Sequence, residues 1–143
     1  YPVGRLDYDT SGLILLTNDG DFAYKLTHPS HEIEKVYIAE LKGIPDRDAI
    51  KSFSRGIPID GRVTAPARIK ILEKRSGTCV AEIRIHEGRN RQVRKMCEAI
   101  GNPVLSLKRI SVGGLELGGL EEGKWRILNK KEVKMLMDKV SGK

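Results

Sequence analysis

Residues 67–100, ARIKILEKRSGTCVAEIRIHEGRNRQVRKMCEAI, decide the fold class of this chain. Apolar and polar side chains alternate in residues 67–73 and again in residues 78–86, as in two strands that each bury one face. An Arg-Ser-Gly sequence at residues 75–77 separates the two runs and predicts a turn. The stretch therefore begins with an antiparallel hairpin, the first part of a sheet.

The second half of the stretch, residues 91–100, follows a helical period instead. Its apolar side chains recur three and four residues apart and form one stripe, made by Val93, Met96, Cys97 and Ile100. Gly101 then ends the helix. Arg94 lies beside the stripe, so we expect its side chain to point from the edge of the core into a cleft.

Outward from this unit, the chain alternates between short strands and helices. The expected strands cover residues 13–17, 34–42, 104–112 and 125–128, and a tight hairpin covers residues 57–63 around Asp60-Gly61. The expected helices cover residues 21–26, capped by Asp21, residues 45–55, stopped by Gly56, and residues 129–140, opened by a capping box of Asn129 and Glu132. Residues 28–31 are expected to form a loop and residues 141–143 to fray. The predicted fold class is α+β, a mainly antiparallel mixed β-sheet flanked by helices on one side.

The composition is that of one ordinary globular domain. The 143 residues are 39% hydrophobic and 31% charged, which excludes a disordered or fibrous chain, and no apolar run approaches the roughly 20 residues of a membrane helix. We interpret Cys79 and Cys97, which lie in apolar patterns, as core residues of a protein in a reducing, cytoplasmic compartment. The histidines lack ligand spacing, so we expect no metal site.

The basic residues favour a polyanionic partner. The net charge is +7, and a local excess of cations lies between residues 84 and 109. This excess consists of Arg84, Arg89, Arg91, Arg94, Lys95, Lys108 and Arg109, against Glu87 and Glu98. Such a segment supplies phosphate contacts and salt-sensitive affinity, although a solvated helix face has the same composition.

Residues 4–20, GRLDYDTSGLILLTNDG, join a polar loop to a buried strand. The loop contains two carboxylates, Asp7 and Asp9, and the apolar run that follows can fix it at the lip of a cleft. Aspartates in loops more often form turns than catalyse reactions. A metal pair is another possibility, but no third ligand is nearby. Spacing alone leaves these alternatives open.

The same loop resembles the central motif of the ribosomal RNA pseudouridine synthases of the RsuA/RluB/RluE/RluF group. The matching residues are Gly4-Arg5-Leu6-Asp7 and Thr10-Ser11-Gly12-Leu13. Further matches follow in the order of the family: Lys35-Val36-Tyr37, then EGRNRQVRKM at residues 87–96, then residues 107–113 with residues 123–126. The similarity spans nearly the whole chain, and several motifs in order are far more specific than any one alone.

The resemblance implies both a site and a reaction. Asp7 would be the nucleophile, Tyr37 the active-site tyrosine and Arg94 the basic residue that pairs with the aspartate. The reaction would cleave the uracil–ribose N-glycosidic bond, rotate the base and rejoin it through carbon, with no cofactor and no metal. The residue types suit this chemistry, because an ionised carboxylate can attack covalently and a guanidinium beside it favours the ionised form. The structural alternatives are a half-buried strand tyrosine and a surface ion pair.

The implied substrate is ribosomal RNA. The Asn90-Arg91 variant of the third motif looks more like the large-subunit branch, similar to RluB, than the small-subunit branch. A target uridine must be unstacked, at a cost of about a few kcal/mol, which contacts to the RNA backbone would help to offset. The candidate RNA contacts are Arg5, Arg89, Arg91, Lys108 and Arg109. The family precedent also implies a monomer, and we expect no membrane partner.

Family members begin with an S4-type RNA-binding domain, and a Lys-Pro-x-Gly motif then marks the first catalytic strand. Residues 1–143 contain neither, so we interpret them as a pseudouridine synthase catalytic domain that lacks both parts, and we expect weaker RNA binding.

Two other functions remain as alternatives. The first is a non-catalytic RNA-binding or ribosome-assembly module, which would gain nothing from an acidic Asp7 facing phosphates. The second is a metal-dependent nuclease that uses Asp7, Asp9 and Asp19.

Overall fold

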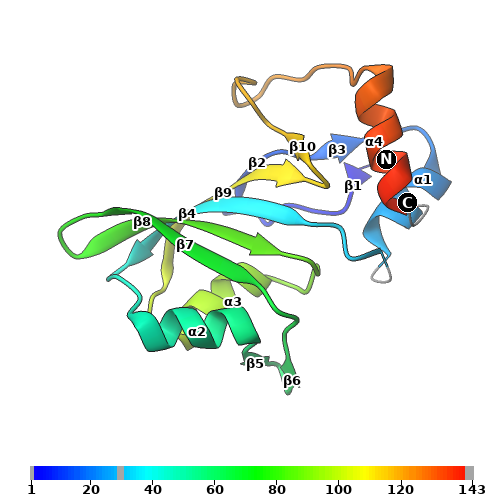
Figure 1. Cartoon of the computed structure of the whole chain (residues 1–143). Coiled ribbons are helices and arrows are strands. Elements are labelled where there is room, and N and C mark those ends of the chain that lie inside the picture. The colour runs from blue at the N-terminus through cyan, green and yellow to red at the C-terminus, as the bar shows by residue number, and fades with distance from the viewer. Residues whose placement is uncertain (1, 29–30, 141–143) are drawn as a thin grey trace.

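The computed structural model describes residues 2–28 and 31–140 and has the expected α+β architecture. Its main sheet has the strand order β10-β9-β4-β8-β7, and β2 pairs with β9 beside this path. The strands are β2 (Ser11–Gly12), β4 (Lys35–Lys42), β7 (Arg68–Lys74), β8 (Thr78–Ile85), β9 (Val104–Val112) and β10 (Leu115–Glu116). All neighbours along the path are antiparallel, whereas β2 runs parallel to β9, so the sheet is mixed as predicted (Figure 1).

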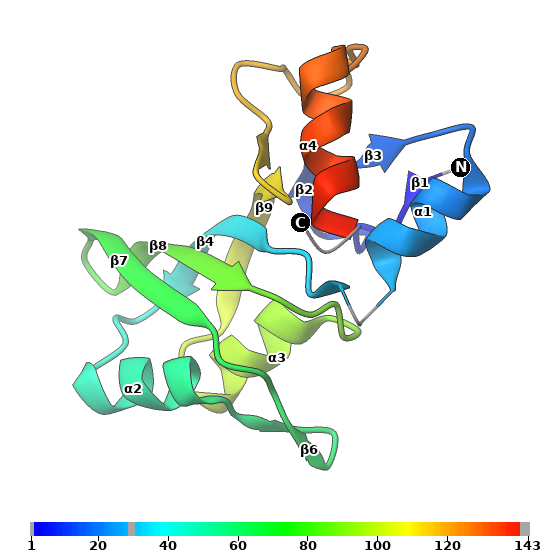
Figure 2. The ribbon, with the colours of Figure 1, turned by 45° about the vertical axis from the view of Figure 1, so that its right-hand side comes forward.

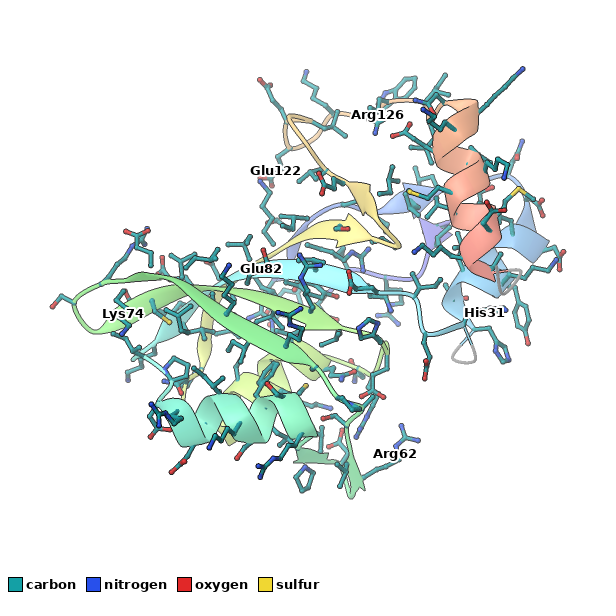
Figure 3. All side chains as sticks on the ribbon, in the orientation of Figure 1. His31, Arg62, Lys74, Glu82, Glu122 and Arg126 are labelled. Atoms are coloured by element: carbon teal, nitrogen blue, oxygen red, sulfur yellow. The ribbon has the colours of Figure 1, made fainter. Side chains whose placement is uncertain are left out.

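Strand β8 shows how the sheet acquires one buried face. Its buried residues are Cys79, Ala81, Ile83 and Ile85, and the residues between them are partly exposed. Glu82 accordingly lies on the face opposite α2 (Arg47–Arg55) and α3 (Gln92–Ala99) (Figure 3). The two helices cover the apolar face and bury Phe53, Met96 and Cys97 against it. The hairpin and helix predicted from residues 67–100 are therefore confirmed.

The other two helices belong to a second core at one end of the sheet. Helices α1 (Gly20–Thr27) and α4 (Lys130–Val140) pack there with the small sheet of β1 (Pro2–Val3) and β3 (Leu15–Leu16) (Figure 2). Leu136 is fully buried in this cluster together with Leu13, Leu15 and Leu26. The expectation that all helices lie on one side is therefore wrong, because the apolar N-terminal run needs a core of its own.

Several local expectations require correction. Residues 13–17 do not form one strand: only Leu15–Leu16 form a strand, β3, which pairs with β1, while the preceding Ser11–Gly12 form β2, which joins the main sheet. The cap of α1 is Asp19, whose side chain accepts from the backbone N–H groups of Asp21 and Phe22, and not Asp21 itself. Residues 125–128 form no strand, and Trp125 is 78% exposed.

Other local expectations hold. Asp46 caps α2, and Asn129 and Glu132 form the reciprocal capping box of α4. Arg126, which is labelled in Figure 3, forms an ion pair with Glu132 at the same helix start. The tight hairpin pairs β5 (Pro58–Ile59) with β6 (Arg62–Val63) around Asp60-Gly61, both of which have positive φ. The predicted fraying of residues 141–143, and the centre of the loop at residues 28–31, lie outside the described residues. Within the described ranges, no helix has the length and apolar character needed to cross a bilayer.

Candidate active-site cavity

A cavity of about 500 Å³ lies where the two hydrophobic cores meet. Apolar residues from both cores line it, among them Leu26 and Val112 from one cluster and Ile85 and Leu107 from the other. Its polar lining comes from widely separated segments, namely residues 4–10, strands β4 and β9, and residues 88–94. A pocket that combines apolar walls with convergent polar groups can hold a small ligand or a nucleobase.

The loop that contains Asp7 is fixed by the parallel pairing of β2 with β9. Gly12 is the register partner of Arg109, and its φ of 110° is one that side-chain-bearing residues rarely adopt. The Leu13 N–H donates to the Arg109 carbonyl oxygen at 2.9 Å, and Arg109 Nε donates to the Leu13 carbonyl oxygen at the same distance. This exchange attaches the end of the loop to the sheet and so positions Asp7 at the cavity.

Asp7 begins a turn in which its carbonyl oxygen accepts from the Thr10 N–H at 3.0 Å. The ion pair recorded with its carboxylate comes from Arg91, at 3.8 Å. The guanidinium of Arg91 also donates to both carboxylate oxygens of Asp9, at 2.9 and 2.8 Å. These hydrogen bonds lower the pKa of Asp9. One arginine therefore links the two carboxylates of the loop.

Arg94 reaches the same turn from α3 but contacts different atoms. Its Nη2 donates to the Asp9 carbonyl oxygen at 2.6 Å and to Thr10 Oγ1 at 3.4 Å, and its Nε lies 3.4 Å from the Asp9 carboxylate. The side chain is only 14% exposed, and among the described residues its buried Nε has no hydrogen-bond partner. The structure thus places Arg94 in the cavity wall, as expected, but next to Asp9, while Arg91 occupies the position beside Asp7.

Tyr37 and Arg109 form the floor of the cavity. They are register partners on β4 and β9, with exposed fractions of 8% and 4%. Burial raises the pKa of the Tyr37 hydroxyl, and the positive charge of Arg109, together with its hydrogen bond, partly opposes this rise. Tyr37 therefore remains a neutral phenol at physiological pH. Arg109, expected to contact RNA from the surface, is instead a buried group that can act only inside the cavity.

Two lining residues were missed by sequence reasoning. Lys35 lies two positions from Tyr37 on the same face of β4, and its Nζ donates to the Glu87 carbonyl oxygen at 3.4 Å. Burial lowers the pKa of Lys35. Gln92 is buried at the start of α3, where its side-chain amide donates to Glu87 Oε1 at 2.8 Å. Both residues lie inside the quoted motif matches, Lys35 at residues 35–37 and Gln92 at residues 87–96, but neither was assigned a role in the site from the sequence.

Of the remaining residues expected to contact RNA, some have exposed side chains and one is hydrogen-bonded within the protein. Arg5 is exposed at the cavity, and Lys108 is exposed on β9 outside it. Arg89 lines the cavity, but its guanidinium donates to the carbonyl oxygens of Ile59 and Arg62 in the β5–β6 hairpin. Arg62 marks this hairpin in Figure 3. Arg89 therefore joins the hairpin to the cavity wall.

The three aspartates considered for a metal site do not form one cluster. Asp19 is engaged at the start of α1, and within the described part of the chain no group of three or more His, Cys, Asp or Glu side chains is arranged to hold a metal ion. The cavity therefore offers one carboxylate, a neutral phenol and several guanidinium groups around a partly apolar space. This combination suits attack by Asp7 on a planar, neutral ring held against Tyr37.

Comparison with known proteins gives a consistent result. A family model described as RNA pseudouridylate synthase matches residues 1–99. The ribosomal large subunit pseudouridine synthase B of Bacillus subtilis is 54% identical over 138 residues, which cover 95% of this chain and 57% of the relative. The ribosomal large subunit pseudouridine synthase E of Xanthomonas campestris is 36% identical, with 94% and 80% of the two chains covered. A crystal structure of a pseudouridylate synthase aligns with a TM-score of 0.87 and 36% identity, covering 95% of this chain and 59% of that one.

Proposed function

Because the chain belongs to the RNA pseudouridylate synthase family, we propose that it isomerises a uridine of ribosomal RNA to pseudouridine, with Asp7 as the nucleophile. This membership bears out the resemblance of its motifs to the RsuA/RluB/RluE/RluF group. The chain spans 57% of the Bacillus relative's length, so residues 1–143 would supply the catalytic domain. The names of the Bacillus and Xanthomonas relatives favour large-subunit RNA as the substrate.

One observation carries the proposal: the motif aspartate lines a cavity whose floor is a buried tyrosine and whose wall is made of arginines. Asp7, Tyr37 and Arg94 come from distant parts of the sequence and line the same cavity. Its volume of about 500 Å³ is enough for one nucleoside, within the usual range of ligand pockets. A non-catalytic RNA-binding module has no need for a carboxylate in such an enclosed position.

The reaction balances without a redox partner. The bond between N1 of uracil and C1′ of ribose breaks, and a bond between C5 and C1′ forms. The C5 hydrogen leaves as a proton, and N1 gains one. Asp7 would attack the sugar or the base covalently, or stabilise the charged intermediate, while the base turns.

Tyr37 and Arg94 would support the carboxylate in different ways. The ring of Tyr37 offers an aromatic face to the uracil, and its neutral hydroxyl lies near the position of the sugar or base. Arg94 has an unsatisfied buried Nε and borders Asp7 through the Asp7–Thr10 turn. To pair with Asp7, the Arg94 guanidinium would turn from Asp9 toward Asp7 when RNA enters. Arg94 would then stabilise the ionised nucleophile.

Access to the cavity requires that the uridine leave its stack, because the pocket admits one base and not a helix. Arg5 remains exposed for phosphate contacts at the cavity, Arg91 lies at its rim, and Lys108 is exposed on β9 outside the cavity lining. These contacts would make binding strongly dependent on salt.

A tritium-release assay tests the proposed reaction. Ribosomal RNA labelled with tritium at C5 of uridine loses label to water only when the C5 hydrogen is exchanged during isomerisation. We expect release with the parent protein in excess chelator, no release with Asp7→Asn, and full release with Asp21→Asn. Asp21 is a matched control because it is an exposed carboxylate on α1 paired with Lys25. Dependence on a divalent metal, with cleaved RNA as the product, would instead support the nuclease alternative.

A further inference from the structure

Tyr8 is an aromatic residue with almost no contact to its own protein. It is 96% exposed, although it follows Asp7 directly in the chain. The turn closed by the Asp7–Thr10 hydrogen bond holds Tyr8 at its corner. Asp7 and Thr10 line the cavity, whereas Tyr8 lies outside the lining, at the rim. A single exposed aromatic residue needs no explanation in itself, but Tyr8 follows the proposed nucleophile directly in the chain, which makes its ring a candidate surface for binding RNA.

The surroundings of Tyr8 are held in place by charge. The guanidinium carbon of Arg91 lies 5.7 Å from the centre of the Tyr8 ring, within the range of a cation–π interaction. Both carboxylate oxygens of Asp9 accept from this guanidinium, which fixes its orientation. Tyr8, Asp9 and Arg91, here called the rim platform, therefore combine an exposed aromatic face with a fixed cation.

Such a platform matches a nucleobase and its phosphate. Aromatic rings and arginine planes are the surfaces on which unpaired bases stack. When a uridine is extruded from its stack, the base next to it in the strand loses one stacking face. The Tyr8 ring lies beside the Arg91 guanidinium, which is also 3.8 Å from the Asp7 carboxylate, so the ring is next to the position of a uridine held at Asp7.

We propose that Tyr8 stacks on the nucleobase adjacent to the target uridine and that Arg91 holds the phosphate between the two nucleotides. This inference rests on the proposed function, since it takes the uridine to lie at Asp7. It makes Tyr8 a substrate-positioning residue, which selects RNA whose neighbouring base can leave its helix. Stacking tolerates any base, so Tyr8 would contribute affinity more than sequence preference.

The charge of the rim favours RNA over an apolar protein partner. Arg5, Arg91 and Arg94 all lie at or next to the turn that holds Tyr8. The apolar residues exposed elsewhere, such as Leu72 and Trp125, lie on other segments and do not extend the rim platform into an apolar patch.

Kinetics on ribosomal RNA test the positioning role. We expect Tyr8→Ala to raise KM by roughly 5- to 100-fold, the range for loss of one base–aromatic stack, and to leave kcat unchanged. Tyr8→Phe keeps the ring and should match the parent. Tyr24→Ala is the matched control, because Tyr24 is another exposed tyrosine outside the cavity lining. An unchanged KM in Tyr8→Ala, a fall confined to kcat, or a Tyr8→Phe as weak as Tyr8→Ala would each overturn the proposal.

A fluorescence measurement separates this proposal from the isomerase reaction itself. The probe is a single-stranded oligouridine RNA with one central 2-aminopurine, whose emission is quenched when it stacks on an aromatic ring. We expect the parent and Asp7→Asn to quench the emission equally on binding, and Tyr8→Ala to bind without that quenching. Absence of tritium release with normal quenching would refute the isomerase and leave the stacking role standing. Equal quenching by Tyr8→Ala and the parent would refute the stacking role alone.

Discussion

Gly12 lies directly against the backbone of Arg109: a β-carbon at Gly12 would fall 2.2 Å from the Arg109 carbonyl oxygen. This approach lets β2 run parallel to β9 and lets the two segments exchange hydrogen bonds through Leu13. The loop that ends at Gly12 contains Asp7, and the strand that contains Arg109 provides the floor of the cavity. The contact therefore determines where the proposed nucleophile lies relative to Tyr37.

The first prediction concerns this contact. Gly12→Ala combines a strained positive φ with a collision against backbone, which cannot move aside. We expect it to lower the free energy of unfolding by about 2 to 5 kcal/mol, the sum of the conformational and overpacking costs. Gly77→Ala is the control, because Gly77 also has positive φ but has no atom within 4 Å of the added carbon. It should cost about 1 to 2 kcal/mol. Urea denaturation measures both, and equal losses would contradict the role of the contact.

The second prediction separates the two arginines of the Asp7–Thr10 turn. Arg94→Lys should lower kcat by about 100-fold, since the lysine cannot reproduce the guanidinium's several hydrogen bonds in the cavity wall. Arg91→Lys, at the rim, should mainly raise KM. Steady-state kinetics on ribosomal RNA provide both values. If Arg91→Lys instead lowered kcat and Arg94→Lys instead raised KM, Arg91 would be the residue that pairs with Asp7 during catalysis.

The third prediction uses the buried thiol of Cys97. Burial raises the pKa of Cys97 from 9.0 to about 12. The pKa of Cys97 is higher in the folded state, so the folded state favours the neutral thiol. The contribution of Cys97 to the free energy of unfolding is therefore fully present below pH 9 and is lost as the pH rises from 9 toward 12. At pH 10 the loss should be about 1.4 kcal/mol. Urea midpoints of the parent and Cys97→Ala between pH 8 and pH 10.5 measure it. Parallel pH profiles for the two proteins would contradict this account.

Local periodicity explains what the sequence could predict. The hairpin of β7 and β8 and the helix α3 were predicted because their apolar residues repeat every second residue or every third and fourth residue. The strand expected at residues 13–17 is shorter than predicted, and this could not be read locally, because the residues just before it join the main sheet through the pairing of Ser11 with Lys108, far along the chain. The strand expected at Trp125 fails for a related reason: no neighbouring strand pairs with it in the described sheets.

The sequence predicted which residues belong to the candidate site better than it predicted the contacts between them. The motif identified Asp7, Tyr37 and Arg94, and all three line the cavity. Which carboxylate each arginine meets depends on the rotation of one turn, and the sequence contains no signal for it. The burial of Arg109 depends on the register of β9 against β4, which shifts at an irregularity between Val36 and Tyr37.

The central claim is that Asp7 is the nucleophile of a ribosomal RNA pseudouridine synthase, and pseudouridine mapping tests it most directly. In a strain that lacks the full-length protein, either the unmodified full-length protein or its Asp7→Asn variant would be restored. The pseudouridine sites in the ribosomal RNA of the two strains would then be compared. The account predicts that one uridine, in large-subunit RNA, is modified again with the parent and remains unmodified with the variant. Restoration by both would show that Asp7 is not the nucleophile. No change with either would contradict the isomerase function and favour the RNA-binding module.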